Sequence, residues 1–137
     1  MSIKLSDKSK FAEDKQKTAH ILFVDDDMDV IRINKMVLEQ IGYDVTTSTG
    51  GKEALHLFES YPQKFDLVIT DISMPGICGF DLTRKLLKIR HDISVIICSG
   101  DTSHETEYKI KEVGAKAFIT KPATMQTIAS TVKGVLN

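Results

Sequence analysis

Acidic, hydroxyl and ammonium side chains follow four of the short apolar runs in this 137-residue sequence. They are Asp25, Asp26, Asp27, Asp71, Ser99 and Lys121. Carboxylates that converge on one crevice repel one another and raise each other's pKa unless a cation neutralises them. Oxygen ligands favour a hard ion, and a site with two or three carboxylates leaves room for water and phosphate oxygens, which suits Mg2+.

Such a set of side chains, gathered in one place, could transfer a phosphoryl group. Mg2+ can bridge a carboxylate and an incoming phosphoryl group, while the Ser99 hydroxyl and the Lys121 ammonium bind its other oxygens. A carboxylate would then be the acceptor. Because the acid pair, the lone acid, the hydroxyl and the lysine each follow a different apolar run, their joint order favours one shared site.

The elements that must position these side chains begin at His20, where apolar runs start to alternate with amphipathic stretches. The runs predict strands over 21–24, 43–47, 67–70, 95–98 and 117–119. Three of them are nearly all apolar, as strands covered on both faces should be. One-sided helices are predicted where apolar residues recur at three-and-four spacing. These residues are Val30, Ile33, Val37 and Ile41; Leu82, Leu86 and Ile89; and Met125, Ile128, Val132 and Val135.

Two weaker helices are predicted over 52–60, with Ala54 and Phe58 facing inward, and over 102–113, where few apolar residues occur. The second of these should be loosely held. The five β–α units predict a single α/β domain: a doubly wound, five-stranded parallel sheet with right-handed crossovers and five helices on both faces. In such a sheet, sites form at the carboxyl ends of the strands where strand order reverses.

Composition limits the other possibilities. Residues 1–19 are mostly charged or small and polar, and are expected to form an extension before the domain at 20–137. The net charge of −1 recommends neither nucleic acid nor a membrane surface as a partner. Cys78 and Cys98 form no disulfide framework and lack zinc-site spacing, so a reducing cytoplasm fits best. No apolar run is long enough to span a bilayer.

Four segments carry a resemblance to a known family. They are Val24-Asp25-Asp26, Thr70-Asp71-Ile72-Ser73-Met74-Pro75-Gly76, Cys98-Ser99-Gly100 and Thr120-Lys121-Pro122. Together they resemble the four signatures of the response-regulator receiver family, the phospho-acceptor of two-component signal transduction. The resemblance covers about residues 20–137. It implies that this stretch is a receiver domain, whose sheet has the flavodoxin-like strand order 2-1-3-4-5.

The resemblance also implies residue roles. Asp71 would be the phosphorylated aspartate and a metal ligand, Asp26 a direct ligand of Mg2+, and Asp25 a ligand acting mainly through water. The backbone carbonyl of Ser73 would complete the protein's share of the coordination. Ser99 would supply the hydroxyl that moves to meet the phosphoryl group, with the Lys121 ammonium as its partner.

Two further features are implied by the family. Phe118 falls at the aromatic switch position, where tyrosine is commoner, so a phenol hydrogen bond is unavailable and switching would rest on packing. The bond between Lys121 and Pro122 would be cis, which only proline makes cheap. Asp101, two residues past Ser99, could lie near the phosphoryl group and position or repel water.

The implied function is a phospho-switch and not an enzyme with a separate substrate, because the domain catalyses only its own phosphorylation and dephosphorylation. The donor would be a sensor histidine kinase or a histidine phosphotransfer protein. The surface of the fourth helix, fifth strand and fifth helix would signal to a partner or output domain, and could pair two copies as a homodimer. Both a single-domain regulator and a piece of a longer protein fit the sequence.

Plainer and rival interpretations remain. Asp25 to Asp27 could merely cap the next helix, and Asp71 could be a turn-former ahead of Pro75. The whole could be a receiver-like scaffold that binds partners without phosphorylation. It could also be a haloacid-dehalogenase-like phosphatase with Asp25 and Asp27 as nucleophile and acid, although Asp29 stands where that family usually has Thr or Val.

Overall fold

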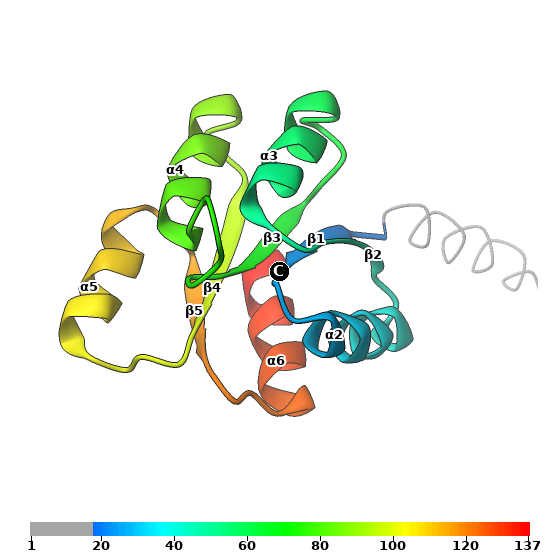
Figure 1. Ribbon diagram of the computed structural model, residues 1–137. Coiled ribbons are helices and arrows are strands. Elements are labelled where there is room, and N and C mark those ends of the chain that lie inside the picture. The colour runs from blue at the N-terminus through cyan, green and yellow to red at the C-terminus, as the bar shows by residue number, and fades with distance from the viewer. Residues whose placement is uncertain (1–17) are drawn as a thin grey trace, which may run out of the picture.

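The computed structural model describes residues 18–137, and these form one five-stranded parallel sheet with helices on both faces (Figure 1). The sheet has the predicted order β2-β1-β3-β4-β5. Its strands are β1 His20–Val24, β2 Asp44–Ser48, β3 Leu67–Asp71, β4 Ser94–Ser99 and β5 Ala117–Thr120. All but the last two residues of the predicted extension at 1–19 lie outside the described residues.

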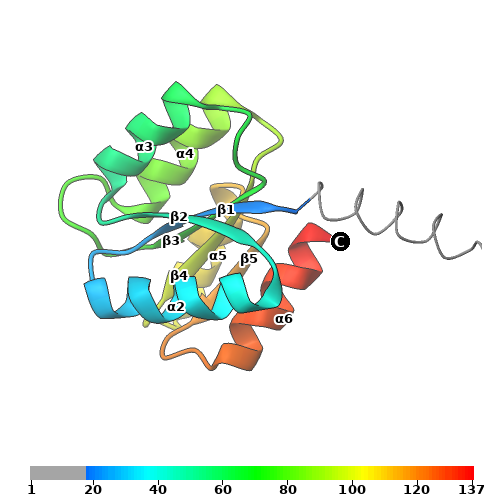
Figure 2. The ribbon, with the colours of Figure 1, turned by 90° about the vertical axis from the view of Figure 1, so that its right-hand side faces the viewer.

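The helices lie in two layers, as Figure 2 shows. They are α2 Met28–Ile41, α3 Gly51–Ser60, α4 Gly79–Ile89, α5 His104–Glu112 and α6 Met125–Leu136. Side chains of α3, α4 and α5 share one buried cluster with Leu22 and Val24 of β1, whereas α2 and α6 share another with Ile21 and Phe23. Because successive strand residues point to opposite faces, each inner strand needs apolar side chains at nearly every position.

The strand register brings the chemical residues to one edge of the sheet. Val24 at the end of β1 pairs with Thr70 of β3, and Asp71 pairs with Cys98 of β4. Ser99 in turn pairs with Thr120 at the end of β5. The residues that follow these pairs therefore all leave the sheet at its carboxyl edge, as the strand order predicts.

The buried face of α2 differs from the predicted one. Ile31 and Leu38 are buried, and Val37 is buried beside them. Ile33 and Ile41, which the spacing placed inward, are 54% and 47% exposed. The helix carries two overlapping apolar stripes, so its periodicity alone did not define the packed face. The prediction for Ile33 and Ile41 was wrong for this reason.

Two other residues that were predicted to face inward are exposed, whereas the prediction of a loosely packed α5 agrees with the structure. Ile89, the last residue of α4, and Met125, the first residue of α6, are 38% and 63% exposed. Terminal turns reach past the sheet and gain little burial there. Ile110 is the one residue of α5 classed as buried, in agreement with the sparse apolar residues of that stretch. Within residues 18–137, no helix has the length and apolar character needed to cross a membrane.

Candidate functional site

Three carboxylates converge at the carboxyl edge of the sheet. Asp25 follows β1, Asp26 comes next, and Asp71 is the last residue of β3. One oxygen from each of these side chains lies within 4.8 Å of the others. The Asp25 side chain is only 3% exposed and that of Asp71 12%, while Asp26 is exposed. Three hard oxygen donors, one of them open to solvent, fit a Mg2+ ion that keeps part of its water shell.

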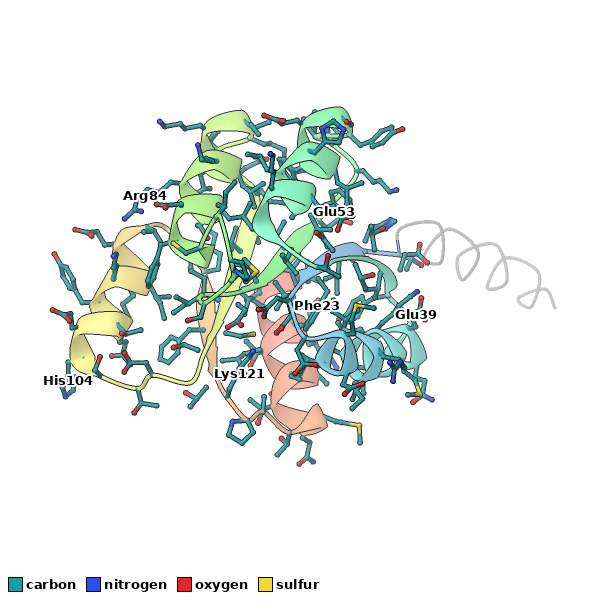
Figure 3. All side chains as sticks on the ribbon, viewed as in Figure 1. Phe23, Glu39, Glu53, Arg84, His104 and Lys121 are labelled. Atoms are coloured by element: carbon teal, nitrogen blue, oxygen red, sulfur yellow. The ribbon has the colours of Figure 1, made fainter. Side chains whose placement is uncertain are left out.

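Lys121 supplies the positive charge of the site. Its ammonium donates a 2.9 Å hydrogen bond to Asp25 Oδ2 and lies 3.3 Å from Asp71 Oδ2. The residue follows β5, where its backbone N–H donates to the carbonyl of Ser99 at 2.8 Å, and the Lys121–Pro122 bond is cis, as the resemblance implied. Figure 3 shows Lys121 at the point where the chain passes from β5 towards α6.

The pKa values of Asp71 and Lys121 are both raised. Burial raises the pKa of Asp71; the Lys121 ammonium opposes this shift and the charge of Asp25 adds to it. Burial acts to lower the pKa of Lys121, but its hydrogen bond to Asp25 and the charges of Asp25 and Asp71 outweigh that effect. The lysine is therefore held as a cation between two acids, and the Asp71 carboxylate is more basic than an exposed aspartate.

The Ser99 hydroxyl, at the end of β4, is hydrogen-bonded to the backbone of Asp101 in this structure. It donates to the backbone carbonyl of Asp101 at 3.1 Å and accepts from the Asp101 N–H at 2.9 Å. A cavity of about 140 Å3 nevertheless joins Ser99 and Asp71, with Ser73 also in its wall. This volume can hold a phosphoryl group, so rotation of the hydroxyl would bring it to an oxygen bound there.

The comparisons with known proteins agree with this geometry. A family model described as the response regulator receiver domain matches residues 21–133, which is most of the chain. This chain belongs to the response regulator receiver family. Its fold and strand order are those of receiver domains, as the four signatures implied.

Curated relatives of this receiver domain include response regulators of staphylococci. The response regulator SaeR of Staphylococcus epidermidis (strain ATCC 12228) is 40% identical over 104 residues, which cover 75% of this chain and 44% of the relative. SaeR of Staphylococcus aureus (strain USA300) is 32% identical over 118 residues, covering 85% of this chain and 50% of the relative. The chain thus spans about half the length of the curated relatives it matches.

Solved receiver structures superpose closely on this one. A response regulator receiver domain protein from Clostridium thermocellum has a TM-score of 0.82 at 31% identity, covering 87% of this chain and 94% of that chain. A CheY-like receiver domain protein from Methanospirillum hungatei JF-1 has a TM-score of 0.81 at 31% identity, with the same two coverages.

Asp27 and Asp25 come from the same run of aspartates, but their side chains bind different groups. Asp27 is the N-cap of α2, and its Oδ1 accepts from the N–H of Asp29 at 2.9 Å and of Val30 at 3.4 Å. The plainer interpretation of the aspartate run therefore applies to Asp27, and the phosphatase alternative loses its acid to a helix cap. Asp25, by contrast, accepts the Asp27 N–H on Oδ1 and the Lys121 ammonium on Oδ2.

The remaining predicted residues lie beside the site. Ser73 lines the 140 Å3 cavity with Asp71, and the ligand role of its carbonyl stays a prediction. Asp101 lines the same cavity, but its carboxylate accepts hydrogen bonds from the Ser103 N–H and the Thr106 hydroxyl. Phe118 on β5 is partly buried against the cluster under α3, α4 and α5.

Two features of the site were not anticipated from the sequence. Thr106, in the first turn of α5, donates a hydrogen bond to Asp101; the only sequence signal for it was the polar run that opens the helix. A second cavity, of about 500 Å3, opens beside α2 and α6, where Asp25, Asp71 and Lys121 meet apolar walls that include Val30 and Ile128. Its position depends on the helix packing, which has no direct sequence signature.

Proposed function

We propose that this receiver domain is a Mg2+-dependent phospho-acceptor that takes a phosphoryl group on Asp71. The observation that carries the proposal is the convergence of three carboxylates around Asp71, with the Lys121 ammonium shared between two of them. The residue set matches the demands of phosphoryl transfer, which are mainly positioning and charge neutralisation.

The donor is a sensor histidine kinase or a histidine phosphotransfer protein. An oxygen of the Asp71 carboxylate attacks the phosphorus, the phosphorus–nitrogen bond of the donor breaks, and the imidazole keeps the bonding pair and takes up a proton. The product on this chain is an acyl phosphate. Asp25, Asp26, Asp71 and the Ser73 carbonyl would hold Mg2+, which when bound neutralises charge on acceptor and donor.

The side chains around Asp71 then bind the new group. Lys121 lies 3.3 Å from the acceptor oxygen Asp71 Oδ2, within reach of a phosphoryl oxygen placed there. The Ser99 hydroxyl leaves the Asp101 backbone and donates to a second oxygen. Hydrolysis of the acyl phosphate restores the Asp71 carboxylate, so the domain catalyses its own phosphorylation and dephosphorylation and has no separate substrate.

Displacement of Ser99 carries the signal to the surface formed by α5, β5 and α6. In chain order these are the fourth helix, the fifth strand and the fifth helix of the domain. The surface then binds a downstream protein, an output domain or a second copy. Phe118 lies on β5 within it and follows the hydroxyl by packing. The change in the free-energy balance between the unphosphorylated and phosphorylated arrangements can be no larger than the difference in their affinity for the phosphoryl group.

One similar structure supports the choice of ligand. The response regulator TrrA from Thermotoga maritima, solved in complex with Mg2+–BeF, has a TM-score of 0.77 at 29% identity and covers 87% of this chain and 100% of that chain. Beryllofluoride on an aspartate stands in for a phosphoryl group. The same complex is therefore a direct probe for the present chain.

The test is the intact mass of the protein after incubation with acetyl phosphate and Mg2+. We expect one added phosphoryl group in the wild type, none in Asp71→Asn, and none when EDTA removes the metal. Ser99→Ala serves as the matched control, because it retains the acceptor and should still form an adduct, more slowly. A folded wild type that gains no adduct and binds no beryllofluoride would sink the proposal in favour of the non-phosphorylated scaffold.

A further inference from the structure

The loop between β4 and α5 holds Ser99 through its own backbone. The Ser99 hydroxyl exchanges two hydrogen bonds with Asp101: it accepts from the N–H at 2.9 Å and donates to the carbonyl at 3.1 Å. Both bonds must break before the hydroxyl can reach a group on Asp71. The position of Asp101 therefore decides how easily Ser99 is released.

Asp101 is itself held by the first turn of α5. Its Oδ1 accepts from the Ser103 N–H at 2.9 Å, and its Oδ2 accepts from the Thr106 hydroxyl at 2.7 Å. These bonds lower the pKa of the Asp101 carboxyl. Ser103 also caps the helix, because its hydroxyl accepts from the Thr106 N–H at 3.2 Å. A continuous set of hydrogen bonds thus joins Ser99 to α5.

The rest of α5 is weakly attached to the domain. Ile110 is its one buried residue, and the Lys109 ammonium lies 4.7 Å from the centre of the Phe80 ring on α4. Tyr108 is 68% exposed. With so few other contacts, the bond between Thr106 and Asp101 is a substantial part of what places the first turn of α5.

Charge adds to this restraint. Asp101 and Thr106 both line the 140 Å3 cavity that contains Asp71 and Ser99. A phosphoryl group in that cavity would carry the same sign of charge as the Asp101 carboxylate, and like charges repel. The carboxylate can withdraw only if its bond to Thr106 is broken.

We propose that Thr106 is a positioning residue for the phospho-acceptor site: its hydroxyl holds Asp101, and through Asp101 the Ser99 hydroxyl, in the arrangement of the unphosphorylated domain. This inference rests on the proposed function. Phosphorylation breaks the Thr106–Asp101 bond as Ser99 moves, so the bond contributes to the free energy needed to reach the phosphorylated arrangement. Removing the bond favours the phosphorylated arrangement.

The test compares Thr106→Val, which replaces the hydroxyl by a methyl group of similar size, with Thr106→Ser, which keeps the hydroxyl. The readout is the affinity for beryllofluoride in saturating Mg2+, measured by calorimetry. We expect Thr106→Val to bind roughly fivefold more tightly, the effect of one hydrogen bond of ordinary strength. Thr106→Ser should match the wild type, and so should Thr102→Val, a control at an exposed residue of the same loop.

A second measurement needs no phosphoryl analogue. Hydrogen exchange of the first-turn amides of α5 in the unliganded protein should be faster in Thr106→Val and unchanged in Thr106→Ser. Asp101→Asn weakens the same bond from its other end and also removes the carboxylate charge, and both effects should tighten beryllofluoride binding, so Thr106→Val remains the variant that isolates the bond. Circular dichroism checks that each variant is folded.

The outcomes separate the inference from the function on which it rests. Equal or weaker beryllofluoride binding by Thr106→Val, beside a wild type that binds it, overturns the role of Thr106 and leaves the phospho-acceptor function standing. A folded wild type that binds no beryllofluoride overturns both. Tighter binding by Thr106→Val and Asp101→Asn, with Thr106→Ser like the wild type, supports the proposal.

Discussion

Lys121 and Asp25 form a 2.9 Å ion pair that joins the loop after β5 to the end of β1. The same ammonium lies 3.3 Å from Asp71, so one cation serves two of the three converging carboxylates. The ammonium therefore offsets part of the negative charge that these two acids bring to the carboxyl edge of the sheet. A divalent cation at the carboxylates would compete with Lys121 for the same oxygens.

Replacing Lys121 should strengthen metal binding. Lys121→Met keeps the unbranched stem and removes the charge, so the carboxylates lose their internal cation. They should bind Mg2+ about tenfold more tightly, which corresponds to about 1.4 kcal/mol and lies at the low end of the ~1–4 kcal/mol by which charges about 4 Å apart interact. The variant should also unfold at a lower temperature in EDTA. Calorimetric Mg2+ titration measures the first effect. An unchanged or weaker affinity would show that Lys121 does not compete with the ion.

Neutralising Asp71 should stabilise the metal-free domain at neutral pH. Burial raises the folded-state pKa of Asp71 above its ordinary value of 3.8, so the native state binds its proton more tightly than the unfolded state. Stability from this group is present at low pH and is lost as pH rises from the unfolded pKa through the folded one. Asp71→Asn removes that loss.

The measurement is the thermal unfolding midpoint of the wild type and of Asp71→Asn in EDTA. It is made at pH values below the unfolded-state pKa of Asp71 and above its folded-state pKa. The variant should have the higher midpoint at neutral pH, and its advantage should shrink as the solution is acidified. Added Mg2+ should raise the midpoint of the wild type more than that of the variant. If the variant were less stable than the wild type at neutral pH, the expected direction of the stability change would be wrong.

Gly79 should tolerate no side chain, because the start of α4 lies against the end of β3. A Cβ atom there would collide with the backbone carbonyl of Asp71 and lie 2.9 Å from Cα of Ile72. Gly79→Ala should cost about 1–3 kcal/mol of unfolding free energy, as overpacking usually does, and should weaken Mg2+ binding because the Asp71 backbone must shift.

The matched control is Gly134→Ala in α6, where nothing lies within 4 Å of the added atom. Alanine is the better helix former, so this change should stabilise the domain by about 0.5–1 kcal/mol. Urea unfolding measures both variants. Equal behaviour of the two alanines would contradict the close approach of α4 to β3.

Arg90 should contribute to the free energy of unfolding and should have no effect on Mg2+ binding at the carboxylates. Its Nη1 donates to the carbonyls of Pro62 and Phe65 at 2.8 and 2.7 Å, which joins the end of α4 to the loop before β3. Arg90→Ala leaves these acceptors without their donor and should cost about 2 kcal/mol.

The control is Arg84→Ala, which breaks a surface pair with Asp81 whose side chains are 45% and 58% exposed. Exposed pairs contribute about 0–1 kcal/mol, so urea unfolding should separate the two arginines clearly. Mg2+ affinity should be unchanged in both variants. Loss of Mg2+ binding in Arg90→Ala would show that the effect reaches the carboxyl edge.

Much of the site was predictable because it depends on strand order. Asp25, Asp71, Ser99 and Lys121 each stand where an apolar run ends, and a parallel sheet brings those ends together. The face of α2 was not predictable, because Ile31 and Leu38 compete with Ile33 and Ile41 as the packed stripe. Periodicity ranks such faces only when one of them is polar.

The sequence by itself determined the alternation of strands and helices, the family, and the residues that meet at the carboxyl edge of the sheet. These follow from local patterns of apolar residues and from short motifs. Only the tertiary structure decided that Lys121 is shared by Asp25 and Asp71, and that Thr106 holds Asp101. Hydrogen-bond partners depend on side-chain directions and loop paths to within an ångström, and spacing along the chain does not specify these.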